Sequence, residues 1–206
     1  MSHSPDRTSH ILQQIIASSS EEGTISIGEF TNLLGDRAFC LTILIFSLPN
    51  SLPVPGIPGF STITGLPILF IALQMLAGRE TIWLPSNLAA KRFSRKGMGL
   101  LLSKALPGVI WLEKYLMPRW FFIADKLGER GLGLLFILLA LIIALPIPGG
   151  NFLPGLSMSL LALGMLERDG MFLTGALVFS IASFIFMVII IALFFHGMIS
   201  GITMLF

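Results

Sequence analysis

One internal repeat limits the folds that this chain can adopt. Residues 34–56 (LGDRAFCLTILIFSLPNSLPVPG) align without a gap with residues 127–149 (LGERGLGLLFILLALIIALPIPG), and nine of the 23 positions are identical. Further along, residues 72–76 (ALQML) align with residues 162–166 (ALGML). Each copy has an acid–Arg pair, an apolar run, a Pro/Gly break, a second apolar run and a polar end. In an apolar chain, such a duplication predicts two membrane-embedded units around a pseudo-two-fold axis.

The composition excludes an ordinary soluble domain. Of the 206 residues, 54% are hydrophobic and only 12% are charged, and the mean hydropathy is +0.89. A soluble domain has about 25% charged residues. Because there are too few ionic side chains to cover a water-facing surface, the sequence predicts an all-α integral membrane protein.

The apolar runs of each copy are short and are separated by proline and glycine. Residues 38–52 would form a helix of about 22 Å, which is less than the roughly 30 Å of a hydrocarbon core. Broken backbone in a bilayer must be covered by protein or water. We therefore predict two pseudo-symmetric helical hairpins, re-entrant or short-span, whose tips are buried against the other copy. The residues that break them are Pro53, Pro55 and Gly56, and Pro146, Pro148 and Gly149.

The repeat organises the chain as a single membrane domain, 1–206. The expected segments are N-terminal amphipathic helices (1–33), repeat 1 (34–80), basic interfacial linker helices (81–126), repeat 2 (127–170) and a transmembrane helix (171–195). Ser26 and Glu29 have the spacing of a capping box for a short helix. The transmembrane segment has 25 residues without a charge, which is long enough to cross a bilayer. Residues 196–206 are expected to form a short apolar tail.

The centre of the chain is basic. Ten of the 13 Lys and Arg residues lie between Arg79 and Arg130, interleaved with aromatic residues. Because short basic loops stay cytoplasmic and aromatic residues gather at the headgroup layer, we expect amphipathic interfacial helices and a cytoplasmic segment 79–130. A lipid surface is favoured over a nucleic-acid partner. The hairpins either both return to this face, which the charge placement favours, or are inverted.

No pattern for catalysis or metal binding is present. The histidines His3, His10 and His196 are scattered, and there is no GxSxG elbow, P-loop or HExxH motif. We therefore expect no enzymatic activity, no catalytic residue, no metal and no cofactor.

The repeated charged residues are the candidates for a binding site. Arg37 and Arg130 occupy equivalent positions, each beside an acid, Asp36 or Glu129. One interpretation is that they end the apolar runs and pair locally at the headgroups. The other is that the pseudo-symmetry brings the two arginines together as a site for an anionic lipid headgroup, because guanidinium groups match phosphate.

Two asparagines, Asn50 and Asn151, lie in the two breaks. An amide in hydrocarbon is costly unless it is hydrogen-bonded. Each asparagine would therefore either bond backbone carbonyls freed by proline, which is favoured, or contact a ligand.

Several motifs resemble the ExoD family of bacterial exopolysaccharide-synthesis proteins. They are LGDRAF, LPNSLPVPGIPG, GLPILFIALQMLAGRE followed by WLP, and LPIPGGNFLPGLSMSLLALGMLERDG. The resemblance extends from about Ser9 to Phe195 and implies a multi-pass protein of the bacterial inner membrane that supports exopolysaccharide synthesis. It implies no catalytic residues and no established ligand.

Two functions remain open. In the first, the hairpins bind or transport an anionic lipid of the polyprenyl-phosphate type, by analogy with membrane families that use paired re-entrant hairpins. In the second, the protein is a non-transporting scaffold that recruits polysaccharide-synthesis enzymes through its basic face, which includes Lys91, Arg92, Arg95 and Lys96. Because one chain offers little cover for the broken backbone, we also expect a homodimer.

Overall fold

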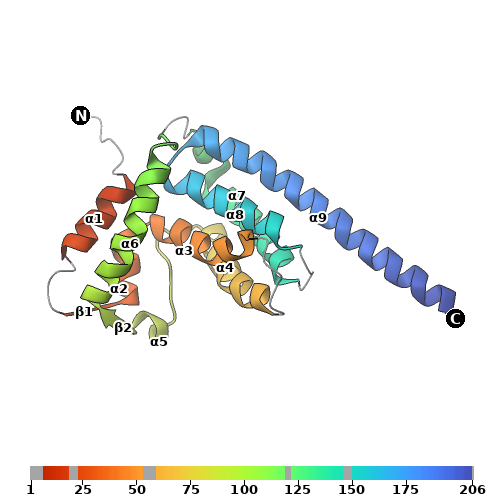
Figure 1. Cartoon of the computed structure of the whole chain (residues 1–206), viewed down its shortest axis with the longest axis horizontal. Coiled ribbons are helices and arrows are strands. Elements are labelled where there is room, and N and C mark those ends of the chain that lie inside the picture. Colours follow the sequence, from red (N-terminus) through yellow and green to blue (C-terminus); the bar gives the residue numbers. More distant parts are fainter. Residues whose placement is uncertain (1–6, 19–22, 53–58, 119–121, 146–149, 206) are drawn as a thin grey trace.

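The computed structural model describes residues 7–18, 23–52, 59–118, 122–145 and 150–205, which are almost entirely helical (Figure 1). The elements are α1 (Thr8–Ser18), β1 (Thr24–Ser26), α2 (Ile27–Leu34), α3 (Arg37–Ser47), the 3-10 helix η1 (Leu48–Ser51), α4 (Phe60–Leu76), α5 (Ser86–Ala89), β2 (Arg92–Ser94), α6 (Arg95–Glu113), α7 (Phe122–Ala144), α8 (Phe152–Leu166) and α9 (Gly170–Leu205). The predicted all-α class is confirmed, with one short ribbon of two strands added.

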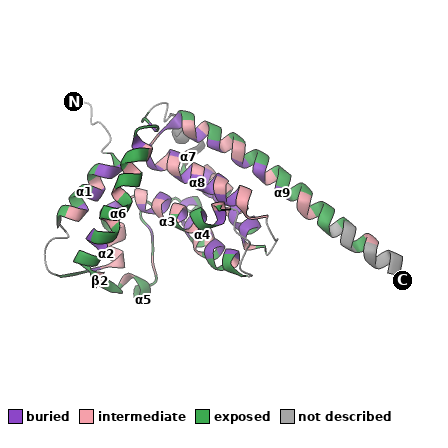
Figure 2. Cartoon of the chain, in the orientation of Figure 1, coloured by how far each residue is buried: buried purple, intermediate pink, exposed green. Residues whose placement is uncertain are grey.

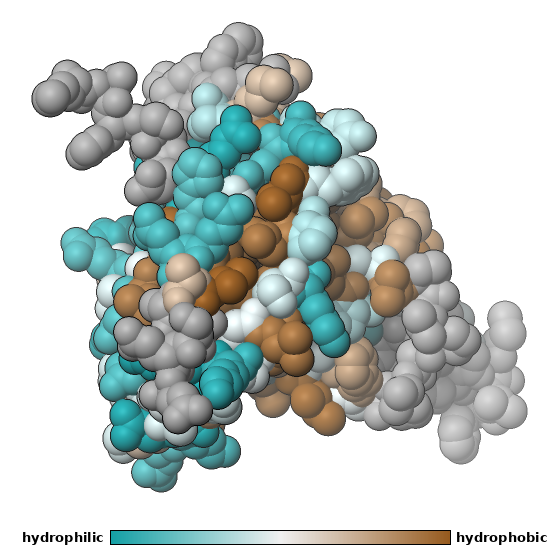
Figure 3. All heavy atoms as spheres, turned by 60° about the vertical axis from the view of Figure 1, so that its left-hand side comes forward, coloured by the Kyte–Doolittle hydropathy of each residue, from teal (hydrophilic) through white to brown (hydrophobic). Residues whose placement is uncertain are grey.

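Helices α1, α2, α5 and α6 and the two strands form a cap at one end of the molecule (Figure 1). Helix α1 packs against α6, and β1 pairs antiparallel with β2. The predicted capping box is confirmed: Ser26 Oγ accepts a hydrogen bond from the Glu29 amide at 3.1 Å, and the Ser26 amide donates to Glu29 Oε2 at 3.0 Å. Figure 3, which brings this side of the molecule forward, shows hydrophilic residues bordering exposed hydrophobic ones.

Helices α3, α4, α7 and α8 form the main bundle, in which α4 packs on α7 and α3 packs on α8. Both pairs are antiparallel: the start of α4 lies at the end of α7, where the Thr62 hydroxyl donates to the carbonyl of Ala144 at 3.1 Å. The helix ends that flank the two Pro/Gly breaks therefore lie together at one end of the bundle. The bundle core is apolar, and its fully buried side chains include Ile43, Ile68, Phe136, Leu139, Met158 and Leu161.

Aligned positions of the two copies make corresponding contacts. The alignment of the repeats pairs Gly65 with Gly155 and Asn50 with Ile143. A Cβ atom on Gly65 would lie 3.4 Å from Ile143 Cγ2, and one on Gly155 would lie 2.7 Å from the carbonyl carbon of Asn50. Because the aligned residues Gly65 and Gly155 have no side chain, the two backbones approach each other closely at equivalent positions of the repeats.

Helices α4 and α8 also end in the same hydrogen-bonded turn. The amide three residues beyond the helix donates back across the turn, from Arg79 to the Gln74 carbonyl and from Asp169 to the Gly164 carbonyl, each at 3.1 Å. This is a Schellman motif, which places the preceding residue in the left-handed region. That residue is Gly78 in the first copy (φ 72°) and Arg168 in the second (φ 51°).

Helix α9 is the longest element and extends well beyond the bundle (Figure 1). Its 36 residues correspond to roughly 54 Å. Among the described helices, its segment Gly170–Phe194 is the one long and apolar enough to cross a membrane as a straight helix. Within the segment expected as a short apolar tail, residues 196–205 continue α9 as helix, since no proline follows Pro154 to end it.

Along the residues of α9 whose burial the structure describes, one face is covered by the rest of the chain. Its buried residues recur at helical spacing: Leu173, Ala176, Ser180, Ser183 and Met187. Exposed apolar residues lie between them along the helix (Figure 2), among them Val178, Ile181 and Ile185, each more than half exposed. An apolar surface of this length supports membrane association.

Candidate functional site

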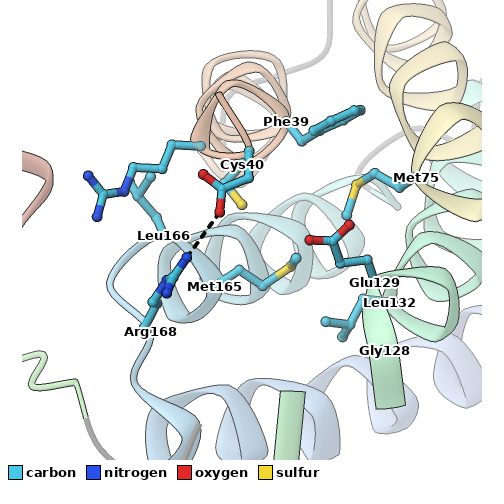
Figure 4. A pocket seen from close by; sticks show the side chains of 11 residues that line it. Phe39, Cys40, Met75, Gly128, Glu129, Leu132, Met165, Leu166 and Arg168 are labelled. Carbon is cyan, nitrogen blue, oxygen red and sulfur yellow. Dashed lines mark hydrogen bonds and ion pairs between the residues drawn. The ribbon is translucent and has the colours of Figure 1, made fainter. Parts of the chain in front are cut away.

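A cavity of about 270 Å³ lies between the two copies, at the end of the bundle that bears the charged residues (Figure 4). Its charged lining residues are Asp36, Arg37, Glu129 and Arg168, and its apolar lining includes Phe39, Met75, Leu132, Met165 and Leu166. These side chains come from the start of α3, from α7 just after its kink at Gly128, and from the ends of α4 and α8, with Asp36 directly before α3 and Arg168 directly after the end of α8. The cavity is thus lined by charged side chains at its rim and by apolar side chains below them.

Both copies contribute equivalent residues to this lining. Asp36 aligns with Glu129, Phe39 with Leu132, and Met75 with Met165, and all six line the cavity. The site is therefore formed where the duplicated segments face each other.

Arg168 connects the two copies across the cavity rim. Its Nη2 donates a hydrogen bond to Asp36 Oδ2 at 3.1 Å. The two side chains are 42% and 56% exposed, so this pair contributes at most about 1 kcal/mol of stability. A non-glycine residue in the left-handed region costs about 1–2 kcal/mol. Strain of this kind gathers at functional sites, which makes Arg168 a candidate binding residue.

Glu129 lies across the cavity from Arg168, next to Met75 (Figure 4). It makes no hydrogen bond or ion pair with another residue in the part of the chain that the structure describes. Its exposed carboxylate lines the cavity.

Behind the cavity, Arg37 also borders a group of buried carboxylates. Glu113 is 5% exposed and Glu167 is 8% exposed. The Ser9 amide and hydroxyl both donate to the Glu113 carboxylate at 2.7 Å, so Glu113 holds the start of α1. Burial raises the pKa of Glu167, the charge of Glu113 raises it further, and the guanidinium of Arg37 opposes both. The charge of Arg37 is thus shared between the cavity and this buried group.

Asp169 fixes the cap to the start of α9. Its carboxylate, 1% exposed, accepts hydrogen bonds from the Met171 and Phe172 amides at 3.1 and 3.0 Å and so caps the helix. Its other oxygen accepts the Met117 amide at 3.0 Å. The segment after α6 is therefore held at the first turn of the apolar helix.

The structure brings together three of the predicted site residues, Asp36, Arg37 and Glu129. Arg130 has a different neighbour: its guanidinium lies 2.9 Å from the place that a Cβ on Gly78 would take. The second arginine at the cavity is Arg168 instead. In the sequence, Arg168 is part of the polar end of an apolar run, and no motif distinguishes it from its neighbours.

The two predicted asparagines lie toward the other end of the bundle. Asn50 is buried, and its amide nitrogen donates to the Phe46 carbonyl at 3.0 Å and to Thr64 Oγ1 at 2.9 Å. These internal bonds agree with the alternative in which the asparagine bonds a backbone carbonyl and does not contact a ligand. Asn151 is half-buried and directly precedes α8. The predicted hairpin breaks, Pro53, Pro55, Gly56, Pro146, Pro148 and Gly149, lie outside the described residues.

No group of three or more His, Cys, Asp or Glu side chains within the described ranges could hold a metal ion. Several serine hydroxyls near the ends of the hairpins lie within hydrogen-bond distance of one another. Ser159 Oγ, for example, lies 2.8 Å from Ser47 Oγ and 2.9 Å from Ser51 Oγ.

The comparisons with known proteins identify the family. The family model described as "Exopolysaccharide synthesis, ExoD" matches residues 8–189. The uncharacterized protein slr1875 of Synechocystis is 30% identical over 200 residues, which are 97% of this chain and 92% of that protein. Protein ExoD of Rhizobium meliloti is 30% identical over 171 residues, which are 81% of this chain and 70% of that protein. No solved structure matches. This chain therefore belongs to the ExoD family.

Proposed function

We propose that this protein supports exopolysaccharide synthesis by binding the phosphate headgroup of a lipid-linked carrier in the cavity between its two copies. Membership of a family described by exopolysaccharide synthesis supports the process. The cavity, with one arginine from each copy above an apolar floor, is the observation that supports the ligand. The proposal is one of binding or transport, without covalent chemistry and without a metal or cofactor.

The placement in the membrane is part of this proposal. The apolar segment Gly170–Phe194 spans the inner membrane, and the two hairpins enter it from one face beside it. The flanks of both breaks lie at the same end of the bundle, and the charged cavity lies at the other. We therefore infer parallel re-entrant hairpins around a pseudo-two-fold axis along the membrane normal, with the cavity and the basic segment 79–130 at the cytoplasmic headgroup layer.

The chemistry of the cavity suits a phosphate monoester on an apolar chain. The planar guanidinium groups of Arg37 and Arg168 each offer parallel donors to phosphate oxygens. An incoming phosphate would replace Asp36 as the partner of Arg168. Met75 and Met165 have flexible, polarizable side chains that adapt to an irregular apolar ligand. A phosphate at the rim would thus place the first carbons of the lipid on the apolar floor.

A binding experiment with purified protein in detergent tests this proposal. Farnesyl phosphate serves as the probe, with farnesol and inorganic phosphate as the two partial ligands. Arg37→Gln and Arg168→Gln should each weaken farnesyl phosphate binding at least tenfold, while Arg92→Gln, on the cap, is the matched control. Equal affinity in wild type and in the double variant would contradict the proposal.

The scaffold function has its own supporting observation. Lys91, Arg92 and Lys96 are exposed on the cap, where they can be reached by a partner protein in the cytoplasm. If neutralising these three residues abolishes polymer production in cells, and the cavity variants retain it, the scaffold function replaces lipid binding.

We also propose a homodimer. Beyond Met187, the last buried residue described on α9, the described residues of the helix are exposed or half-buried (Figure 2). A second copy of α9 would cover part of this apolar surface. A mass measurement in detergent that finds only monomers would contradict this assembly.

A further inference from the structure

The surface formed by residues 81–118 carries positive charge and no exposed acidic residue. The single acid in this stretch, Glu113, is 5% exposed and bonded to Ser9. Its basic residues are Lys91, Arg92, Arg95, Lys96, Lys104 and Lys114, and all but the half-buried Arg95 are exposed. Such a surface attracts an anionic partner.

Helix α6 combines this charge with exposed apolar side chains on one face. Leu101, Lys104 and Trp111 recur at helical spacing, and Tyr115 continues this face in the turn after the helix. Leu101, Trp111 and Tyr115 are 69%, 57% and 66% exposed. The rings of Trp111 and Tyr115 contact each other, with centroids 5.0 Å apart. The opposite face, with Leu102, Leu106 and Val109, packs against the core. The outward face is thus not needed to hold the fold together.

The end of α6 is fixed beside the membrane-spanning segment. The Met117 amide donates to Asp169 Oδ2 at 3.0 Å, and the same carboxylate caps the first turn of α9. In Figure 1, α6 runs across the end of the bundle at a steep angle to α9. If α9 crosses the bilayer, α6 lies at the level where the bilayer surface begins.

We propose that the outward face of α6, formed by Leu100, Leu101, Lys104, Trp111 and Tyr115, binds the surface of a bilayer that contains anionic lipid. Trp and Tyr favour the membrane–water interface, because one part of each ring system is apolar and another is polar. Lysine places its apolar stem in the interface and its ammonium among the phosphates. Amphipathic helices with basic and aromatic residues lie in the interface plane. The contact with the start of α9 favours lipid over a soluble acidic protein as the occupant.

This surface differs from the cavity in its residues, and the two proposals can fail separately. Lipid at the α6 face would hold the cap on the membrane whether or not the cavity binds a phosphate. The test therefore measures whether Trp111 on α6 lies in lipid or in water, and it contains no lipid-linked carrier.

The test uses the full chain with Trp83→Phe and Trp120→Phe, which leaves Trp111 as the fluorophore. The protein is reconstituted into phosphatidylcholine vesicles with and without 30% phosphatidylglycerol, and the lipids carry bromine near the headgroup or deep in the acyl chain. We expect the shallow bromine to quench Trp111 several-fold more strongly than the deep bromine. We also expect phosphatidylglycerol to increase the shallow quenching.

A second variant with Lys96→Gln, Lys104→Gln and Lys114→Gln tests the role of charge in the same background. We expect it to keep the quenching in phosphatidylcholine and to lose the increase with phosphatidylglycerol. If neither bromine quenches Trp111, while acrylamide quenches it equally in vesicles and in detergent, α6 faces water and the proposal is overturned. An unchanged circular-dichroism melting curve shows that each variant is folded.

Discussion

Gly155 in α8 lies directly against the backbone of Asn50: a Cβ built on Gly155 would lie 2.7 Å from the carbonyl carbon of Asn50 and 2.9 Å from its oxygen. The partner here is backbone, which cannot rotate away as a long side chain can. The same closeness occurs in the other helix pair, where a Cβ on Gly133 would lie 2.8 Å from the amide nitrogen of Leu76. These two contacts show how closely the segments of the two repeats approach each other.

The first prediction concerns this contact. Gly155→Ala should destabilise the protein by about 1–3 kcal/mol, because the added methyl forces η1 and α8 apart. The midpoint of thermal unfolding in detergent measures it. Gly175→Ala is the control, since a Cβ there has no neighbour within 4 Å and alanine is the better helix former. Equal midpoints for the two variants would show that the helices do not pack this closely.

The second prediction separates strain from binding at Arg168. Arg168→Gly relieves a positive φ of 51° and removes an exposed ion pair of small value, so stability should be unchanged or rise by up to about 1 kcal/mol. Farnesyl phosphate binding should nevertheless fall at least tenfold. Gly78→Ala, at the equivalent turn with φ 72°, should lower stability. A parallel loss of stability and binding in Arg168→Gly would mean that the arginine serves the fold.

The third prediction is a pH dependence that originates at Glu167. Its pKa is raised above 4.5 by burial, so between 4.5 and the raised value the folded protein keeps a proton that the unfolded chain has lost. Stability should therefore fall as the pH rises through this window. Above the window, the folded protein bears the full free-energy cost of the ionised Glu167 carboxylate. The charged groups around this carboxyl are Arg7, Arg37, Glu113 and Arg168.

Glu167→Gln tests this directly. The variant should have a flatter pH profile of thermal unfolding than the wild type and a higher midpoint near neutral pH, because a neutral amide replaces a buried charge. Identical profiles would assign the pH dependence to other groups.

The fourth prediction concerns the connection after α4. The Gln74 side chain donates to the Trp83 carbonyl at 3.1 Å and accepts the Trp83 amide at 2.6 Å. Gln74→Leu leaves both backbone groups without this partner and should cost about 1–3 kcal/mol of unfolding free energy. Gln14→Leu, at an exposed position on α1, is the control and should change stability by less than about 0.5 kcal/mol. Similar losses in both variants would contradict the role of Gln74.

Some features were predictable from sequence because local chemistry specifies them. Ser26 and Glu29 form a capping box whose two bonds need only a spacing of three residues. The apolar residues 171–195 have no charge or proline to interrupt a spanning helix. The family was recognisable from motifs spread along the chain, and the family model and the Rhizobium relative confirm it.

Other features depend on packing between distant segments. The ribbon pairs three residues of β1 with three of β2 across more than 60 positions, too short a pattern to detect in sequence. The alignment pairs Arg37 with Arg130, but their surroundings differ. Gly78 leaves room for the guanidinium of Arg130, whereas the aligned position in the other copy is Arg168. Arg37 lies between the cavity that Arg168 also lines and the buried carboxylates Glu113 and Glu167.

In the proposed topology, both hairpins enter the membrane from the face that bears the cavity. Cysteine labelling tests this in a Cys40→Ser background, with Lys96→Cys on the cap, Glu129→Cys at the cavity and Ser51→Cys at the end of the first hairpin. A membrane-impermeant maleimide is applied to oriented vesicles of either sidedness. We predict that positions 96 and 129 react from the same, cytoplasmic face and that position 51 does not react from that face. Reaction of positions 96 and 129 from opposite faces would contradict the account.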